Sequence, residues 1–187
     1  MTSQKPLSAE IEARLRPIKL LALDGDGVLT DGALVYDHHG DDQHVFSVRD
    51  GHGLFLLHRH VKDLKLALVS GRHSLSMARR VKELNFDFVL QGVQSKAAML
   101  RELCLQCDID LGEVCYVGDD INDIGALRIS GLSVAVSDAV MEAKNHAQWI
   151  TTAPGGKGAV REICEAILKA KGLWPEVLRR FEDEALD

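Results

Sequence analysis

Apolar and polar residues alternate along this chain in blocks that predict strands separated by helices. The short apolar runs predict strands at 18–23, 64–69, 86–90, 113–117, 132–136 and 149–151, and the segments between and after them predict helices at about 49–60, 74–84, 95–107, 139–146 and 158–171. In the second helix, Met77, Val81 and Leu84 fall on one face. Strands alternating with helices predict a doubly wound α/β fold, in which a parallel sheet is covered by helices on both faces.

Two parts of the chain depart from this alternation. Residues 33–48 contain two β-rich runs around a turn-rich tip, which predicts a β-hairpin inserted after the first strand. A lone hairpin is marginal in water, so we expect it to pair with another structure. His38 and His39 at its tip indicate an exposed polar turn in preference to a metal loop.

The two ends of the chain are polar. Residues 1–16 predict a short N-terminal helix, and the tail 172–187, which contains Pro175, is expected to be mobile or to dock elsewhere. The chain has 187 residues, without an internal repeat or a linker. We therefore expect residues 1–187 to form a single domain.

Two aspartates directly follow the first predicted strand. Asp24 and Asp26 are separated by Gly25, and Gly27 comes next. Glycine lets the backbone bend, so both carboxylates can converge on one divalent cation. The structural alternative is an acidic turn after a buried strand. Open α/β sheets bind ligands at the carboxyl ends of their strands, which favours a functional site.

Further polar residues stand at the ends of later strands. These are Ser70, Gly71 and Arg72 after 64–69, Lys96 at the start of a helix, and Asp119, Asp120 and Asp123 after 113–117. Each alone has a plain structural explanation, such as a helix cap, a solvated lysine or an acidic loop. Because the strand ends of a parallel sheet lie side by side, all of them can share one crevice with Asp24.

Together these residue types suit hydrolysis of a phosphate ester. Asp24 would attack phosphorus to give an aspartyl-phosphate, and Asp26 would protonate the leaving alcohol and then activate water. The Ser70 hydroxyl and the Lys96 ammonium would hold the phosphoryl oxygens. Mg²⁺ would screen carboxylate from phosphate. The metal ligands that we expect are Asp24, Asp26, Asp119 and Asp123, with Asp120 open as the further acid in place of Asp123.

The motifs resemble those of the haloacid dehalogenase superfamily of phosphatases, over about residues 18–170. The segments that carry the resemblance are 24–32 (DGDGVLTDG), 49–51 (RDG), 70–72 (SGR), 118–120 (GDD) and 155–162 (GGKGAVRE). They are similar to a branch of that superfamily acting on sugar-acid phosphates. This likeness implies an eight-carbon sugar-acid phosphate substrate, Mg²⁺, a role in lipopolysaccharide precursor synthesis and a homotetramer.

The spacing of the motifs leaves no room for a separate cap domain. Asp26 and Ser70 are 44 positions apart, and Ser70 and Lys96 are 26 positions apart. A small-substrate phosphatase still has to exclude water, and a neighbouring subunit can do so. In the resembled family the hairpins pair at the tetramer centre and one subunit's C-terminal segment reaches the next subunit's site. We therefore expect active sites near subunit interfaces, with the glycine-rich turn 155–158 contributing there.

Arg72 is the residue that we expect to select the substrate, with Gly71 beside it. A guanidinium can bind the carboxylate of a sugar acid through two hydrogen bonds. Relatives acting on nine-carbon sugar-acid phosphates tend to carry Glu at this position, so Arg72 favours the eight-carbon substrate. Arg49 is a second candidate for a substrate or subunit contact, a structural salt bridge being the alternative. Gly25 replaces a larger apolar residue usual in the family, which predicts a looser nucleophile loop.

Composition narrows the remaining alternatives. A formal charge of −6 and the absence of a long apolar run argue against nucleic-acid and membrane partners, and we expect a cytoplasmic protein. The four cysteines, Cys104, Cys107, Cys115 and Cys164, are expected to be buried structural thiols. A signalling receiver domain would place its phosphoacceptor about 40 residues after the paired acids, unlike this chain. A nine-carbon substrate and an inactive sugar-phosphate-binding homologue stay open.

Overall fold

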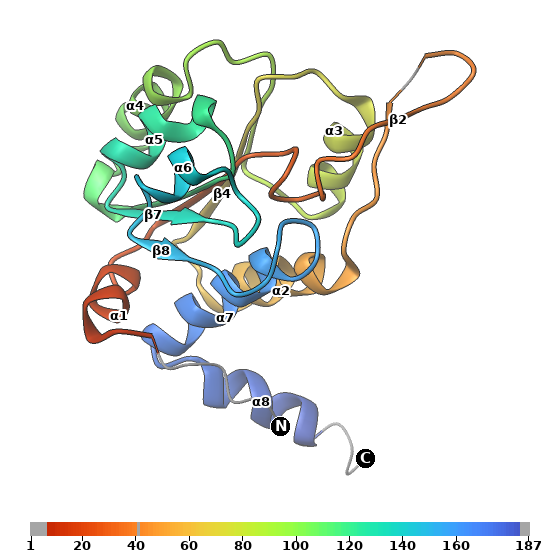
Figure 1. The fold of residues 1–187 in the computed structure, drawn as a ribbon. Coiled ribbons are helices and arrows are strands. Elements are labelled where there is room, and N and C mark those ends of the chain that lie inside the picture. Colours follow the sequence, from red (N-terminus) through yellow and green to blue (C-terminus); the bar gives the residue numbers. More distant parts are fainter. Residues whose placement is uncertain (1–6, 41, 184–187) are drawn as a thin grey trace.

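The computed structural model describes residues 7–40 and 42–183 and is built around a six-stranded sheet (Figure 1). The strands are β1 (Leu20–Leu23), β4 (Lys65–Val69), β5 (Phe88–Leu90), β6 (Val114–Gly118), β7 (Leu132–Ala135) and β8 (Trp149–Ile150). The helices are α1 (Ala9–Leu15), α2 (Val48–His60), α3 (Leu75–Glu83), α4 (Lys96–Cys107), α5 (Ile124–Ile129), α6 (Met141–Lys144), α7 (Ala159–Ala170) and α8 (Trp174–Asp183). Two single 3₁₀ turns cover Leu111–Glu113 and Ile121–Asp123.

All neighbouring strands of this sheet are parallel, in the order β5-β4-β1-β6-β7-β8. Helices α4, α5 and α6 lie on one side of the sheet, and α1, α2 and α7 lie on the other (Figure 1). The sequence-based prediction of a doubly wound parallel sheet is confirmed. The strand order reverses between β1 and β6, which is where such folds open a crevice for ligands.

The central strands are apolar because both of their faces are covered. Leu20 to Leu23 of β1 are fully buried, and so are the residues of β6 up to Val117. Serines end the preceding loops and begin the helices. Ser74 and Ser95 each accept a hydrogen bond from the backbone amide three residues later, which satisfies one free N–H of α3 and α4. These caps fix where the loops from β4 and β5 stop.

The hairpin is shorter than the sequence predicts. Antiparallel pairing is confined to β2 (Val35–Tyr36) and β3 (Asp42–Gln43), and the expected strand at 44–48 is not a strand. After Gln43 the chain leaves its partner strand because His44 turns towards Ser76 of α3, and α2 begins at Val48. The hairpin projects away from the sheet (Figure 1), and His38 and His39 at its tip are exposed, as expected. In the described residues it is the sole insertion between β1 and α2.

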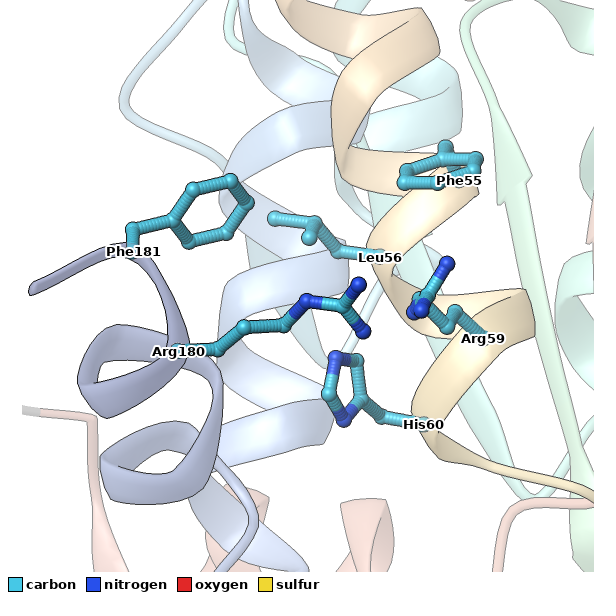
Figure 2. Close-up of a pocket in the computed structure, with 6 residues that line it drawn as sticks. All are labelled: Phe55, Leu56, Arg59, His60, Arg180 and Phe181. Atoms are coloured by element: carbon cyan, nitrogen blue, oxygen red, sulfur yellow. The ribbon is translucent and has the colours of Figure 1, made fainter. Parts of the chain in front are cut away.

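The C-terminal tail forms a helix and docks on the same chain. Val177 of α8 is buried, and Trp174 lies under the cationic side chains of Arg161 and Lys169 of α7. Pro175 stands in the first turn of α8, where its missing N–H costs nothing. Figure 2 shows side chains of α8 facing α2 across a pocket of about 200 Å³, which is lined by Phe55, Leu56, Arg59, His60, Arg180 and Phe181.

The four cysteines are free thiols. Cys104, Cys115 and Cys164 are buried and Cys107 is half-buried, which fits the predicted structural role for the three buried thiols. Burial raises the pKa of the Cys104, Cys115 and Cys164 thiols, so they stay protonated. No helix within 7–40 and 42–183 has the length and apolar character needed to span a membrane.

Candidate active site

A pocket of about 270 Å³ opens at the carboxyl ends of β1, β4 and β6. It is lined by Asp24, Asp26, Gly27, Gly32, Ser70, Gly71, Arg72, Asp119, Asp120 and Asn122. Register brings these residues together: Leu23, at the end of β1, pairs with Leu68 of β4 and with Val117 of β6. The next residues of the three strands therefore meet at one edge of the sheet.

Lys96 is the buried cation of this site. It is the first residue of α4 and only 3% exposed. Its Nζ lies 2.8 Å from Oδ1 of Asp24 and 2.6 Å from Oδ1 of Asp123. Burial alone would lower the pKa of Lys96, but the two carboxylates outweigh burial and raise it. Lys96 is therefore charged, and it holds one oxygen of Asp24 in place together with the amide of Gly25, 2.7 Å away.

Asp123 is fully buried and accepts four hydrogen bonds. Its Oδ1 accepts from Lys96 Nζ at 2.6 Å and from the Tyr116 hydroxyl at 2.6 Å. Its Oδ2 accepts from the backbone amides of Asp119 at 3.0 Å and Asp120 at 3.2 Å. Both oxygens are thus engaged in holding Lys96 and the loop after β6, a role that the sequence did not indicate.

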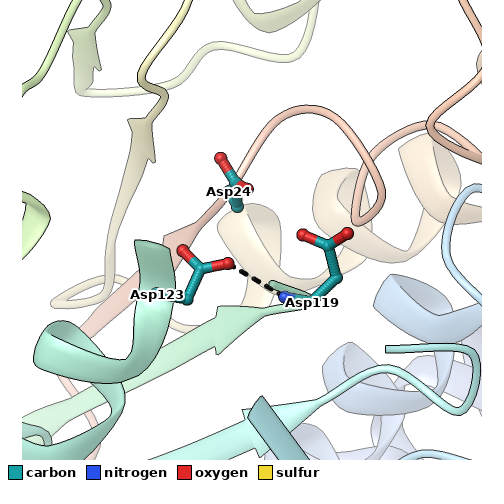
Figure 3. A group of neighbouring side chains, drawn as sticks. All are labelled: Asp24, Asp119 and Asp123. Carbon is teal, nitrogen blue, oxygen red and sulfur yellow. Dashed lines mark hydrogen bonds between the residues drawn. The ribbon is translucent and has the colours of Figure 1, made fainter. Parts of the chain in front are cut away.

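Asp24, Asp119 and Asp123 form a compact acidic group suited to a cation (Figure 3). One oxygen from each lies within 4.8 Å of the other two. Burial, then the neighbouring carboxylates, raises the pKa of Asp24 to about 6 and of Asp119 to about 8. Lys96 compensates only part of this negative charge, and hard oxygen ligands are what Mg²⁺ prefers. The residues present therefore fit a divalent cation.

Glycines let three loops approach closely at the pocket. Gly27 has a positive φ of 81°, and a Cβ there would collide with the carboxylate of Asp119. A Cβ on Gly155 would collide with the carbonyl of Gly27, so the glycine-rich turn packs on the loop after β1 of the same chain. Beside Gly25, the methyl end of Met77 occupies the nearby space, 3.1 Å from where a Cβ would stand. A side chain at Gly25 would therefore require Met77 to move.

The end of β4 supplies Ser70, Gly71 and Arg72 to the pocket. Ser70 is buried and accepts from the Arg72 amide at 3.2 Å, and it is not a helix cap, since Ser74 caps α3. The Arg72 side chain is 41% exposed, and its Nε lies 3.5 Å from Oδ2 of Asp26. Arg72 thus stands at the pocket opening beside Asp26.

Asp42 in β3 and His44 directly after β3 also reach this site. Asp42 Oδ2 lies 3.5 Å from Arg72 Nη2, and His44 Nε2 lies 2.8 Å from Asp26 Oδ1. Sequence reasoning missed both, because their partners are distant in the chain and an isolated acid or histidine in a hairpin carries no spacing signal. Only an alternation of buried and exposed positions along this segment could have pointed to them.

Arg49 is not brought to the pocket. It is exposed in the first turn of α2 and is not among the pocket-lining residues. Its neighbour Asp50 has a structural role: Oδ2 accepts from the Gly158 amide at 3.1 Å and Oδ1 from the Arg161 amide at 2.7 Å. Asp50 in α2 therefore caps the start of α7. This structural role accounts for the motif at 49–51 without a catalytic function.

Comparison with known proteins agrees with this geometry. Residues 88–163 match the family model described as haloacid dehalogenase-like hydrolase. The chain is 37% identical over 162 residues to the 3-deoxy-D-manno-octulosonate 8-phosphate phosphatase KdsC of Haemophilus influenzae, covering 87% of this chain and 89% of that one. It is 36% identical over 172 residues to KdsC of Yersinia pestis, covering 91% and 90%.

The fold is also close to a solved structure with ligands. The 3-deoxy-D-manno-octulosonate 8-phosphate phosphatase of Moraxella catarrhalis, in complex with a magnesium ion, a phosphate ion and a KDO molecule, superimposes with a TM-score of 0.89. The two are 37% identical, and the match covers 92% of this chain and 98% of that one. This chain belongs to the haloacid dehalogenase-like hydrolases and, among them, to the 3-deoxy-D-manno-octulosonate 8-phosphate phosphatase family.

Proposed function

We propose that this protein hydrolyses 3-deoxy-D-manno-octulosonate 8-phosphate to the free sugar acid and phosphate, in lipopolysaccharide precursor synthesis. The observation that carries the proposal is the arrangement of Asp24, Asp26 and Arg72 around one pocket. It supplies a nucleophile, a proton donor and a carboxylate-binding cation within reach of one small substrate.

The first step forms a bond between Asp24 and phosphorus. Lys96 and the Gly25 amide both hold Oδ1 of Asp24, which leaves Oδ2 to attack. As the phosphorus–oxygen bond to the sugar breaks, Asp26 gives its proton to the departing oxygen, and the alcohol leaves. Ser70, which lines the pocket, and Lys96, which contacts Asp24, are the residues that we expect to hold the phosphoryl oxygens.

The second step restores the enzyme. Asp26, now ionised, takes a proton from a water molecule, and that water attacks phosphorus to release phosphate and free Asp24. Mg²⁺, when bound, neutralises charge between the carboxylates and the phosphoryl group. Asp24 and Asp119 are the ligands that we favour, with Asp26 as a further candidate. Asp123 also belongs to the acidic group, but its four hydrogen bonds favour an anchoring role.

We infer that Arg72 binds the substrate carboxylate, with Gly71 keeping the approach open. A partly exposed guanidinium at the opening can turn from Asp26 to an incoming carboxylate and bind it through two hydrogen bonds. Arg49, exposed on α2, stays a candidate for a subunit contact. A nine-carbon sugar-acid phosphate is the alternative substrate.

We also infer a cytoplasmic homotetramer. Val35, Tyr36, Val45 and Val48 on and beside the hairpin are 55–81% exposed, and such apolar side chains on a short ribbon favour pairing with other subunits. Four free thiols fit a reducing compartment. Light scattering of the purified protein tests the tetramer, and a monomeric mass contradicts it.

The test of function is phosphate release with Mg²⁺ from eight- and nine-carbon sugar-acid phosphates, glucose 6-phosphate and an aryl phosphate. We expect kcat/KM to be highest for the eight-carbon substrate. If only the aryl phosphate is hydrolysed, the protein is a phosphatase but the eight-carbon sugar-acid phosphate is not its substrate. If no compound releases phosphate, the hypothesis of an inactive sugar-phosphate-binding protein would replace the hypothesis of an enzyme.

A further inference from the structure

Residues 44–47, which connect β3 to α2 and which we call the hairpin arm, begin with an inward-pointing side chain between exposed neighbours. His44 follows β3, and its side chain is 0% exposed, whereas Gln43 and Val45 on either side are exposed. Its Nε2 lies 2.8 Å from Oδ1 of Asp26. A histidine ring that loses all its water contact at a pocket edge needs polar partners for its nitrogens.

The other ring nitrogen is held by α3. Nδ1 of His44 lies 2.6 Å from Oγ of Ser76 in the first turn of that helix. The Ser76 hydroxyl is 3.1 Å from that of Ser74, and Ser74 donates to Oδ1 of Asp42 at 3.2 Å. One ring nitrogen therefore contacts the Ser76 hydroxyl of α3, and the other contacts the carboxylate of Asp26.

The contact between His44 and Asp26 is close and buried. In the described part of the chain, Nε2 and Oδ1 lie 2.8 Å apart, both are buried, and neither makes a hydrogen bond of regular geometry. Two bare lone pairs at this distance would repel and leave both groups unsatisfied. When the Ser76 hydroxyl donates to Nδ1, the ring hydrogen sits on Nε2, and Oδ1 of Asp26 is an acceptor 2.8 Å from that nitrogen.

We propose that His44 is a positioning residue for Asp26. By holding Oδ1, it turns Oδ2 towards the oxygen of the leaving alcohol and stops the carboxyl group from rotating. The proton that moves in the reaction is the one on Oδ2, and His44 keeps its own. This inference rests on the proposed function of Asp26 as acid and base. It makes the hairpin arm part of the active site of its own subunit.

The experiment compares two leaving groups in His44→Ala. An alkoxide of a sugar needs a proton as it departs, whereas p-nitrophenolate does not, and kcat/KM reports the step in which that bond breaks. We expect kcat/KM to fall at least about 30-fold for the eight-carbon sugar-acid phosphate and less than about threefold for p-nitrophenyl phosphate. His44→Gln, whose amide can reach Asp26, should restore most of the loss.

His39→Ala, at the exposed tip of the same hairpin, is the matched control and should leave both values unchanged. An equal loss with both substrates in His44→Ala, or no loss with either, overturns the inference. If that variant does not fold, Ser76→Ala is measured instead. This substitution removes the contact at Nδ1 and leaves the one at Nε2. We expect kcat/KM to fall about threefold to tenfold for the sugar substrate alone, and an equal fall for both substrates would overturn the inference. Wild-type protein inactive on every phosphate would refute the proposed function, a separate outcome.

Discussion

The floor of the pocket and its rim are built in different ways. We call Asp24 and Asp119, with their buried partners Lys96 and Asp123, the floor. We call Asp26 and Arg72, with their partners Asp42 and His44, the rim. Lys96 and Asp123 of the floor are 3% and 0% exposed, and their ion pair measures 2.6 Å. On the rim, Arg72 is 41% exposed, and its contacts with Asp26 and Asp42 are both 3.5 Å.

This difference separates the residues that attack phosphorus from the residues that meet the leaving group. The floor stands on adjacent strand ends of a packed sheet, so its side chains have little freedom. The rim depends on loops and on a hairpin with two short strands, so it can rearrange around a ligand. Variants of the floor should therefore remove turnover or stability with every substrate, whereas variants of the rim should have effects that depend on the leaving group of the phosphate.

The largest effect is expected for Asp24→Asn. An amide is a poor nucleophile, so kcat should fall on the order of 10³-fold or more with every substrate. The fold should survive, because the change removes a buried charge and keeps the shape. Phosphate release measures kcat, and circular dichroism measures whether the fold is kept. Asp31→Asn, an exposed acid of the same motif, is the control, and near-normal kcat in Asp24→Asn would refute the nucleophile.

Lys96→Met should be the most destabilising change at the floor. It leaves Asp24 and Asp123 buried without their cation, which costs about 3–5 kcal/mol of unfolding free energy. Urea unfolding measures this loss. Adding Asp24→Asn to Lys96→Met should recover part of it, because one of the uncompensated charges is gone. Equal stability of the single and double variants would show that Asp24 and Lys96 are not coupled.

The floor should also make the metal-free protein sensitive to pH. The raised pKa values of Asp24, about 6, and Asp119, about 8, mean that the folded state keeps protons which the unfolded chain, at about 3.8, has released. This contribution to stability is complete below pH 3.8 and is lost as pH rises through 6 and 8.

In EDTA, Tm should therefore fall by several degrees between pH 6 and pH 9, since 1 kcal/mol corresponds to about 2–4 °C in a chain of this size. Saturating Mg²⁺ should remove most of the fall, and Asp119→Asn should flatten it without metal. Differential scanning fluorimetry suffices. A Tm that is independent of pH in EDTA would contradict the raised pKa values.

The smallest effect is expected at the rim. Arg72→Lys keeps a cation but loses the planar pair of donors, so KM for the eight-carbon sugar-acid phosphate should rise about tenfold. KM for an aryl phosphate, which has no carboxylate, should stay the same, and Tm should change by less than about 2 °C. A parallel rise in both KM values would assign Arg72 to the phosphoryl group instead.

The pattern of apolar runs was enough to predict the sheet, because a strand buried on both faces must be apolar along its length. It failed at the hairpin arm, where 44–48 has β-rich composition but no strand partner. It also left the tail undecided: α8 is a short amphipathic helix, and only the apolar face offered by α2 and α7 stabilises it.

The sequence by itself determined Asp24, Lys96 and Asp119 of the floor, and Ser70 near them, because these residues follow strands or start helices, and parallel strands carry such positions to one edge. Only the tertiary structure decided the contacts between segments that are distant in the chain. Those are the hydrogen bond from Lys96 to Asp123, the capping of α7 by Asp50, and the placement of His44 against Asp26. A periodic pattern records which face of an element is buried, whereas a single polar contact between distant residues leaves no periodic trace.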